Sequence, residues 1–140
     1  MKLYLDASVI VALVTTDLFT PRAVAYLGAM APILLISDFV AAEFASVIVR
    51  RVRTRETSRQ VARVVFAALD AWVLRTAERV ETTTADVVLA EAALRRLDLP
   101  LRTADALNIT IARRVADALM TFDDKMAASA KALGVEVVAA

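Results

Sequence analysis

Four acidic residues of this sequence lie among apolar neighbours, where an isolated carboxylate is costly if it is buried. Asp6 and Asp123 each follow a short apolar run, and Glu43 and Asp105 each interrupt one. The simplest shared explanation is a bound hard cation, because carboxylate oxygens favour Mg²⁺ or Mn²⁺. Such an ion can orient a water molecule and stabilise a leaving oxygen, which is the chemistry of phosphodiester hydrolysis.

Two residue types that usually carry catalysis are absent from the chain. It contains no cysteine, which excludes disulfides, zinc–thiolate sites and thiol nucleophiles. It contains no histidine, which removes the commonest general base and the Ser-His-Asp triad. Any catalysis must therefore depend on carboxylates, hydroxyls, lysine, arginine or a metal ion.

Composition predicts one domain spanning residues 1–140, located in the cytoplasm. The chain is 59% hydrophobic, yet no apolar stretch approaches the ~18 residues of a membrane-spanning helix, and no signal peptide is recognisable. The net charge is only +1, but arginine dominates the cationic residues. This bias suits a phosphate-containing ligand, although a GC-rich genome explains it equally well.

The order of apolar runs and helical patterns predicts an α/β fold. Short runs without polar alternation at 2–5, 33–36, 118–121 and 135–138 are typical of strands buried on both faces, and 79–82 is a further candidate strand. Helical patterns occupy most of the chain between them. This alternation indicates a mainly parallel central sheet with helices on both faces.

Helix starts are predicted from capping residues. The expected N-caps are Thr20, Ser37, Thr57 or Ser58, Thr84 and Thr103. The expected helices begin near 8, 21, 38, 58, 85, 104 and 124. Neither of the two glycines belongs to a phosphate-binding loop, so dinucleotide and Walker-type fingerprints are absent.

Strand-end geometry predicts that the four acids meet. Asp6 and Asp123 follow strands, and ligands of parallel sheets bind outside the carboxyl ends of the strands. Glu43 and Asp105 lie in the first turns of helices that start near the same edge. Two charges about 4 Å apart repel by roughly 1 kcal/mol in water and ~4 kcal/mol at an effective dielectric of 20. Clustered acids must therefore take up protons or bind a cation.

Each acid also has a purely structural explanation. Asp123 or Asp124 can cap the last helix, and Glu43 can pair with an arginine. Asp105 can stabilise a helix by lying near the positive end of its dipole. Asp86 is an internal control, because Thr-Ala-Asp occurs at 84–86 and again at 103–105. Local sequence alone does not separate these two aspartates.

Two hydroxyl residues are candidate supports for the acids. Ser8 stands two residues after Asp6 and can bond a carboxylate or an ion-bound water, or simply cap a helix. Thr121 can act in the same way beside Asp123, or be an ordinary strand residue.

These residues resemble the motifs of the PIN domain over essentially the whole chain. The segment 4–13 is similar to the first motif of that family, Ala42-Glu43-Phe44 to the second, 103–108 to the third and 121–123 to the fourth. The resemblance favours Asp105 over Asp86, and Asp123 over Asp124, which keeps a supporting role. One departure is Asn108, where many relatives carry histidine.

Length and motif style are most similar to VapC toxins of type II toxin–antitoxin pairs. The resemblance implies a Mg²⁺- or Mn²⁺-dependent ribonuclease that forms a homodimer, cleaves RNA and is inhibited by a VapB-type antitoxin. It implies that Asp6, Glu43, Asp105 and Asp123 are the catalytic and metal-binding residues. The alternatives are a PIN nuclease for RNA processing or for DNA, and a catalytically idle binding module.

Basic residues near the acids are candidate RNA contacts. Arg102 and Lys125 adjoin the motif acids in sequence and are the first candidates. The run 50–55 contains four arginines, which can contact RNA, an antitoxin or a second subunit. A solvated helix end, with cations at the negative end of the helix dipole, explains the run as well.

Overall fold

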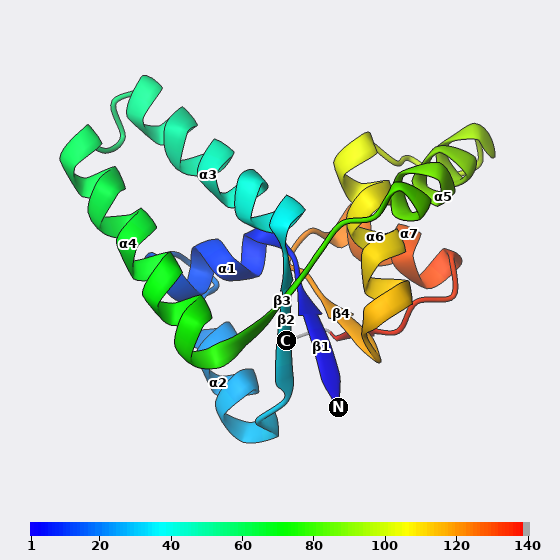
Figure 1. Ribbon diagram of the computed structural model, residues 1–140, viewed down its shortest axis with the longest axis horizontal. Helices are drawn as coiled ribbons and strands as arrows, with labels where there is room; N and C mark the ends of the chain where they lie inside the picture. Colours follow the sequence, from blue (N-terminus) through cyan, green and yellow to red (C-terminus); the bar gives the residue numbers. More distant parts are fainter. Residues whose placement is uncertain (139–140) are drawn as a thin grey trace.

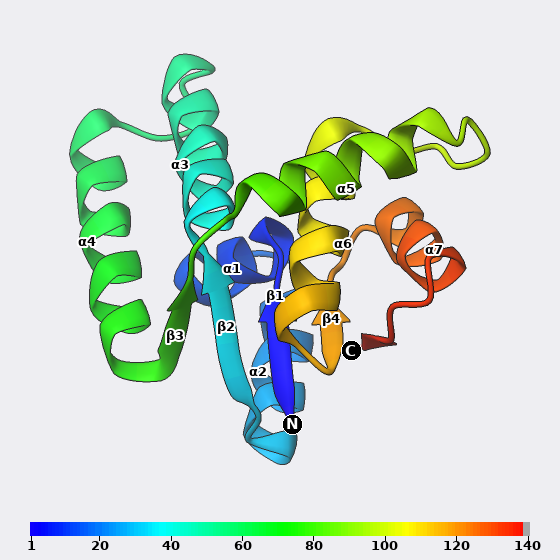
Figure 2. The ribbon, with the colours of Figure 1, turned by 45° about the vertical axis from the view of Figure 1, so that its right-hand side comes forward.

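A computed structural model describes residues 1–138 as an α/β fold built on one five-stranded sheet. The strands are β1 (Lys2–Leu5), β2 (Ile33–Ser37), β3 (Ala77–Val80), β4 (Ala118–Met120) and β5 (Val137–Val138). Their order is β3-β2-β1-β4-β5, and every neighbouring pair is parallel. The prediction of a parallel central sheet is confirmed (Figure 2).

Helices cover both faces of this sheet, as predicted. The helices are α1 (Ala7–Val14), α2 (Thr20–Met30), α3 (Asp38–Arg53), α4 (Arg59–Thr76), α5 (Thr84–Arg95), α6 (Thr103–Val115) and α7 (Asp124–Ala132). Figure 1 shows α1 to α4 on one side of the sheet and α5 to α7 on the other. Right-handed crossovers require this division, because the chain moves from β1 outward to β3 and then returns past β1 to β4 and β5.

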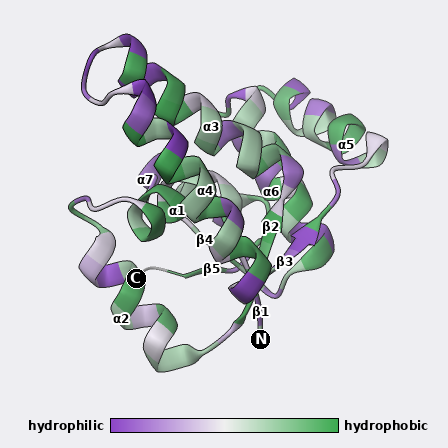
Figure 3. Ribbon diagram, turned by 60° about the vertical axis from the view of Figure 1, so that its left-hand side comes forward, coloured by the Kyte–Doolittle hydropathy of each residue, from purple (hydrophilic) through white to green (hydrophobic). Residues whose placement is uncertain are grey.

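The centre of the sheet forms the core. Leu3, Tyr4 and Leu5 of β1 are fully buried, and so are Leu119 and Met120 of β4. Burial on both faces explains why these strands show no polar alternation. Hydrophilic residues gather instead at the turn between α3 and α4 (Figure 3). In residues 1–138, no helix combines the length and apolarity needed to cross a membrane.

Some predicted strand ends are wrong. β3 begins at Ala77 rather than Arg79, and β5 contains only Val137 and Val138. β4 ends at Met120, which leaves Thr121 in the following loop. Pairing with the neighbouring strand sets these limits, and apolar composition does not reveal them.

Three predicted N-caps are displaced by one residue, whereas Ser37 and Ser58 are confirmed as caps. Thr83 caps α5 and Arg102 occupies the N-cap position of α6. Thr20 belongs to α2, where its hydroxyl bonds to Ala12 O at 2.7 Å instead of capping. In each case the helix extends one residue further toward the N-terminus than the pattern indicated.

Candidate functional site

The candidate site lies where the topology of the sheet reverses. β1 pairs with β2 on one side and with β4 on the other, and ligands of parallel sheets bind beyond the carboxyl ends at such a point. Asp6 directly follows β1 and caps α1. Asp123 follows β4 and caps α7, and Asp105 lies in the first turn of α6. Three helix N-termini, with their partial positive charge, are thereby joined to three of the predicted acids.

All four predicted acids line one cavity of about 540 Å³. The polar side chains around it are Asp6, Ser8, Asp17, Glu43, Arg50, Arg102, Asp105, Asn108 and Asp123. Within residues 1–138, no three acids are close enough together to form a ready-made metal cluster. The acids therefore surround a shared space rather than touch one another. This arrangement suits Mg²⁺, which usually keeps several waters and takes only one or two protein carboxylates.

Asp6 is held by hydrogen bonds to both of its carboxylate oxygens. Ser8 Oγ donates to Oδ1 at 2.6 Å, and Thr121 Oγ1 donates to Oδ2 at 2.7 Å. The backbone N–H of Val9 also donates to Oδ1, at 3.2 Å. Burial raises the pKa of Asp6 despite these bonds, and the charge of Asp123 adds to the rise. A cation in the cavity would offset this cost by stabilising the ionised form.

The two hydroxyls that hold Asp6 also fix the loop after β4. Ser8 Oγ accepts the backbone N–H of Phe122 at 3.0 Å, and Thr121 Oγ1 accepts that of Asp123 at 3.0 Å. Each hydroxyl thus donates to Asp6 and accepts from the loop. The first and fourth motifs are therefore connected by direct hydrogen bonds.

Asp105 and Asp123 face the same cationic side chain. Arg102 Nε lies 3.5 Å from Asp105 Oδ2, and Arg102 Nη2 lies 4.0 Å from Asp123 Oδ2. Asp105 Oδ2 also accepts the backbone N–H of Arg102 at 3.1 Å. Asp123 Oδ1 accepts the N–H groups of Lys125 and Met126, as a capping aspartate does. Asp105 thus lies at a helix N-terminus and Asp123 caps a helix, as their structural explanations require. These roles are compatible with a place in the cavity.

Glu43 approaches the cavity from α3 and bonds to a residue that sequence reasoning did not assign to the site. Asn108 Nδ2 donates to Glu43 Oε1 at 2.5 Å. Burial raises the pKa of Glu43 to about 6, and the charges of Asp6 and Asp105 add to the rise. Two sequence signals pointed to Asn108: it is a polar residue among the apolar residues of α6, and it closes the segment 103–108 that resembles the third motif.

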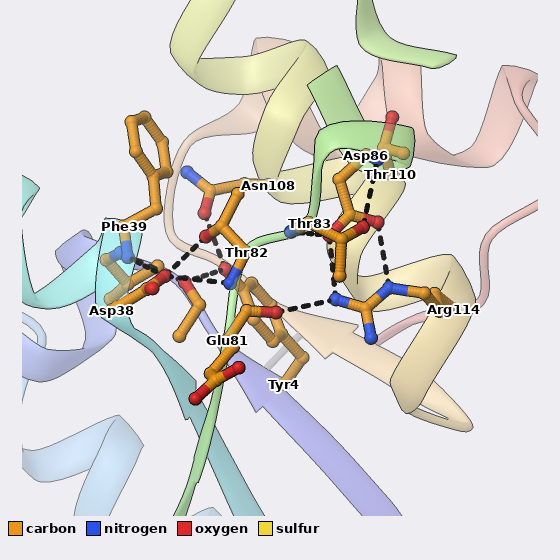
Figure 4. A network of polar contacts seen from close by, with 12 residues as sticks. Tyr4, Asp38, Phe39, Glu81, Thr82, Thr83, Asp86, Asn108, Thr110 and Arg114 are labelled. Carbon is orange, nitrogen blue, oxygen red and sulfur yellow. Dashed lines mark hydrogen bonds and ion pairs between the residues drawn. The ribbon is translucent and has the colours of Figure 1, made fainter. Parts of the chain in front are cut away.

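Asp86, the internal control, is engaged elsewhere. It is fully buried and forms a bidentate ion pair with Arg114, with Nε–Oδ1 and Nη2–Oδ2 distances of 2.8 and 2.7 Å. Arg114 also donates to Glu81 O at 2.9 Å. Asp86 does not line the cavity of the four acids. Its role within the described residues is to hold α5 against α6, as the close-up of this network shows (Figure 4).

The basic residues that were predicted as candidate RNA contacts lie at more than one place on the molecule. Arg102 and Lys125 line an adjoining cavity of about 410 Å³ together with Asp105 and Asp123. In the run 50–55, Arg50 lines the acidic cavity, whereas Arg53 lines a groove between α3 and α4. The run therefore does not act as one surface.

Two further acids lie at positions that the sequence did not indicate. Asp124, predicted to support the site, is exposed and lines a different cavity, beside Phe122 and Arg22. Asp17, which sequence reasoning passed over, lines the acidic cavity. It lies in the loop before α2 and interrupts no apolar run, so the criterion that selected the other acids did not detect it.

Comparison with known proteins defines the class to which this fold and site belong. A family model described as "PIN domain" matches residues 3–132, and the chain belongs to this family. A search of curated protein sequences finds no significant match.

Solved structures similar to this chain come from several bacteria. VapC20 of Mycobacterium tuberculosis, described as a sarcin-ricin loop cleaving toxin, has a TM-score of 0.72 at 19% identity, covering 91% of this chain and 94% of its own. FitAcB of Neisseria gonorrhoeae has a TM-score of 0.71 at 17% identity, with coverages of 98% and 96%. VapBC2 of Rickettsia felis, bound to a promoter DNA fragment, has a TM-score of 0.69 at 15% identity, with coverages of 99% and 98%. At these identities the likeness establishes the shared fold.

Proposed function

We propose that this protein is a Mg²⁺- or Mn²⁺-dependent endoribonuclease that acts as the toxin of a type II toxin–antitoxin pair. The observation that carries the proposal is the single cavity lined by Asp6, Glu43, Asp105 and Asp123, which come from four distant parts of the chain. Membership of the PIN family and the likeness to VapC20 support this choice of chemistry.

The four acids are the proposed ligands of the ion. Their donor atoms are carboxylate oxygens, which hard divalent cations prefer. The raised pKa values of Asp6 and Glu43 further support a cation, because burial disfavours the ionised form of each and a bound cation would offset that cost. When bound, the ion would activate water and polarise the scissile phosphodiester.

The remaining residues of the site would bind and orient the RNA. Arg102 and Lys125 line the cavity that adjoins the acids, where a phosphate group could reach both. Ser8 and Thr121 would keep Asp6 in one orientation through their bonds to its two oxygens.

We further propose a VapB-type antitoxin as partner, a homodimeric assembly and a cytoplasmic site of action. Two similar solved structures, VapBC2 of Rickettsia felis and FitAB, are complexes bound to DNA fragments, which supports a partner of this kind. In this chain, the groove lined by Val52, Arg53 and Phe66 offers both apolar and cationic contacts to such a partner.

RNA cleavage by the purified protein tests the proposal. We expect cleavage with Mg²⁺ or Mn²⁺, none with excess chelator, and none from Asp6→Asn or Asp105→Asn. Asp86→Asn is the matched control, because its local sequence is the same but it lies outside the cavity.

Equal cleavage by the wild type and both site variants would remove the site assignment. Two other outcomes would favour other functions. Cleavage of DNA in preference to RNA would favour a DNA nuclease, and no Mn²⁺ binding by the wild type in calorimetry would favour a binding module. Growth arrest on expression, relieved by a small protein encoded next to this one, would support the toxin role over RNA processing.

A further inference from the structure

Asn108 stands at the end of a buried chain of hydrogen bonds that leads to Glu43. Its side chain is buried on α6 with only 2% exposed. Tyr4 Oη donates to Asn108 Oδ1 at 2.7 Å, and Asn108 Nδ2 donates to Glu43 Oε1 at 2.5 Å. The two ends of one carboxamide therefore join a core tyrosine to a carboxylate of the candidate site. Figure 4 shows Tyr4 and Asn108 within this part of the molecule.

The hydrogen bonds in this chain share one direction when Tyr4 donates to Asn108. Tyr4 has a single hydroxyl proton, which it donates to Asn108. The 2.7 Å contact between Tyr4 Oη and Ser37 Oγ must then use the proton of Ser37. Ser37 Oγ in turn accepts the N–H of Val40 at 3.0 Å. Every donor from Val40 to Asn108 thus points toward Glu43.

Burial makes this direction stable. Tyr4 and Ser37 are both completely buried, so neither hydroxyl can turn to water. A reversed carboxamide would require Tyr4 to donate to Ser37 instead and would leave an ionised Glu43 facing an oxygen. The bond from Tyr4 and the contact with Glu43 therefore favour the same orientation of Asn108.

We propose that Asn108 is a positioning residue for the nuclease site, which presents an N–H donor to Glu43 in an orientation fixed by Tyr4 and Ser37. The proposal rests on the proposed function in one respect, since it takes Glu43 to be a cation ligand. Groups that orient metal ligands in this way typically change metal affinity by about 10–100-fold when they are removed. The bond occupies Oε1 and so restricts how the carboxylate can rotate.

The sequence allows a direct test of the contact by NMR. Asn108 and Gln60 are the only residues of the chain with side-chain carboxamides. A ¹⁵N-labelled sample should therefore show two side-chain NH₂ pairs, and exposed Gln60 is an internal control. We expect the Asn108 pair to exchange with water at least about tenfold more slowly than the Gln60 pair. Glu43→Gln and Tyr4→Phe should each shift the Asn108 pair and leave Gln60 unchanged.

A double-mutant cycle tests the function of the contact. Mn²⁺ affinity is measured by calorimetry without RNA for the wild type, Asn108→Leu, Glu43→Gln and the double variant. Asn108→Leu should weaken Mn²⁺ binding by about tenfold. In the Glu43→Gln background the same change should have no further effect, because Asn108 acts through Glu43. Equal effects in both backgrounds would overturn the proposal and indicate a general structural role.

A conservative variant guards against misfolding. In Asn108→His, the imidazole offers one acceptor for Tyr4 and one N–H donor for Glu43. We expect this variant to recover Mn²⁺ affinity and kcat relative to Asn108→Leu. Circular dichroism shows whether each variant is folded. If Asn108→Leu is unfolded, the proposal is tested by the NMR experiment on the wild type and by the Mn²⁺ affinity of Asn108→His.

Failure of this inference differs from failure of the proposed function. If the wild type binds Mn²⁺ and cleaves RNA but Asn108→Leu does the same, the positioning role is wrong and the nuclease stands. If the wild type binds no Mn²⁺ and cleaves no RNA, the proposed function is wrong and the positioning role falls with it. An Asn108 pair that exchanges as fast as Gln60, or that ignores Glu43→Gln, overturns the contact itself.

Discussion

Asp86 and Arg114 form a bidentate ion pair, with both nitrogen–oxygen distances below 3 Å, at 2.8 and 2.7 Å. Asp105 has the same two preceding residues but lines the acidic cavity. The tripeptide Thr-Ala-Asp thus contributes an ion pair at one place and a cavity-lining acid at the other. The difference arises because Arg114 lies opposite Asp86, whereas Asp105 faces the acidic cavity.

The first prediction compares these two aspartates. Asp86→Asn should lower the free energy of unfolding by about 1–3 kcal/mol, because it weakens the charge-assisted hydrogen bonds from Arg114, whose side chain stays partly exposed. Asp105→Asn should change stability by less than about 1 kcal/mol and reduce RNA cleavage by at least about 100-fold. Urea unfolding and a cleavage assay measure the two effects. Comparable losses of activity in both variants would contradict the distinction.

The second prediction concerns pH. In the folded protein the pKa of Glu43 is raised from 4.5 to about 6. Between these values the folded state binds more protons than the unfolded state, so stability conferred by Glu43 falls as pH rises through this window. Glu43→Gln should remove this dependence. Urea unfolding between pH 4.5 and pH 7, with a chelator present, measures it.

An exposed glutamate provides the control for the pH experiment. Glu91, which pairs with Arg95 on the surface of α5, should leave the pH dependence unchanged when replaced by glutamine. An unaltered slope of stability against pH between 4.5 and 6 in Glu43→Gln would refute the assignment of this pH dependence to Glu43.

The pKa of Asp86 is shifted in the opposite direction, because it is lowered in the folded protein. The stability that Asp86 confers is therefore lost as pH falls below the pKa of the unfolded state.

The third prediction concerns metal addition. At pH 7, Mg²⁺ or Mn²⁺ should raise the unfolding temperature, since binding to the folded state alone adds about 2.7 kcal/mol at 100 times the dissociation constant. Differential scanning fluorimetry with and without chelator measures the shift. Asp6→Asn should abolish most of the shift, and Asp86→Asn should retain it from a lower starting temperature. A metal-induced shift of full size in Asp6→Asn would argue against Asp6 as a ligand.

The fourth prediction concerns the hydroxyl of Thr121. Thr121→Val should lower the free energy of unfolding by about 1–3 kcal/mol, because Asp6 Oδ2 loses its hydrogen-bond donor and the N–H of Asp123 loses its acceptor. It should also weaken Mn²⁺ binding, which calorimetry measures. Thr121→Ser keeps the hydroxyl and should bind Mn²⁺ more tightly than Thr121→Val. If the two variants bind Mn²⁺ equally, the hydroxyl does not support Asp6.

The fifth prediction concerns RNA affinity. Arg102→Gln in an Asp6→Asn background should weaken RNA binding and reduce the slope of log K against log salt by about 0.7 for each lost phosphate contact. Fluorescence anisotropy at several salt concentrations measures both quantities. Arg113→Gln is the control, because Arg113 lies in the last turn of α6, at the opposite end from Asp105. A slope that falls equally in both variants would indicate only a general charge effect.

The predictions from sequence succeeded where local pattern and chain order carry the information. Buried strands without polar alternation and intervening helices define a parallel sheet, and the carboxyl ends of its strands share one edge. Asp6 and Asp123 therefore had to approach each other. The cap of α5 was misplaced because neighbouring threonines compete for that position. The limits of β3 depend on pairing with β2, and α6 begins after Arg102, which apolar patterns do not reveal.

The sequence by itself determined the fold class and the edge of the sheet where the acids gather, since both follow from periodicity and strand order. Only the tertiary structure decided which polar group faces each acid. Arg114 meets Asp86, Thr121 meets Asp6, and Asn108 meets Glu43, across separations of 28 to 115 residues. Such pairings depend on how helices and loops pack across the sheet, and no local pattern in the chain encodes them.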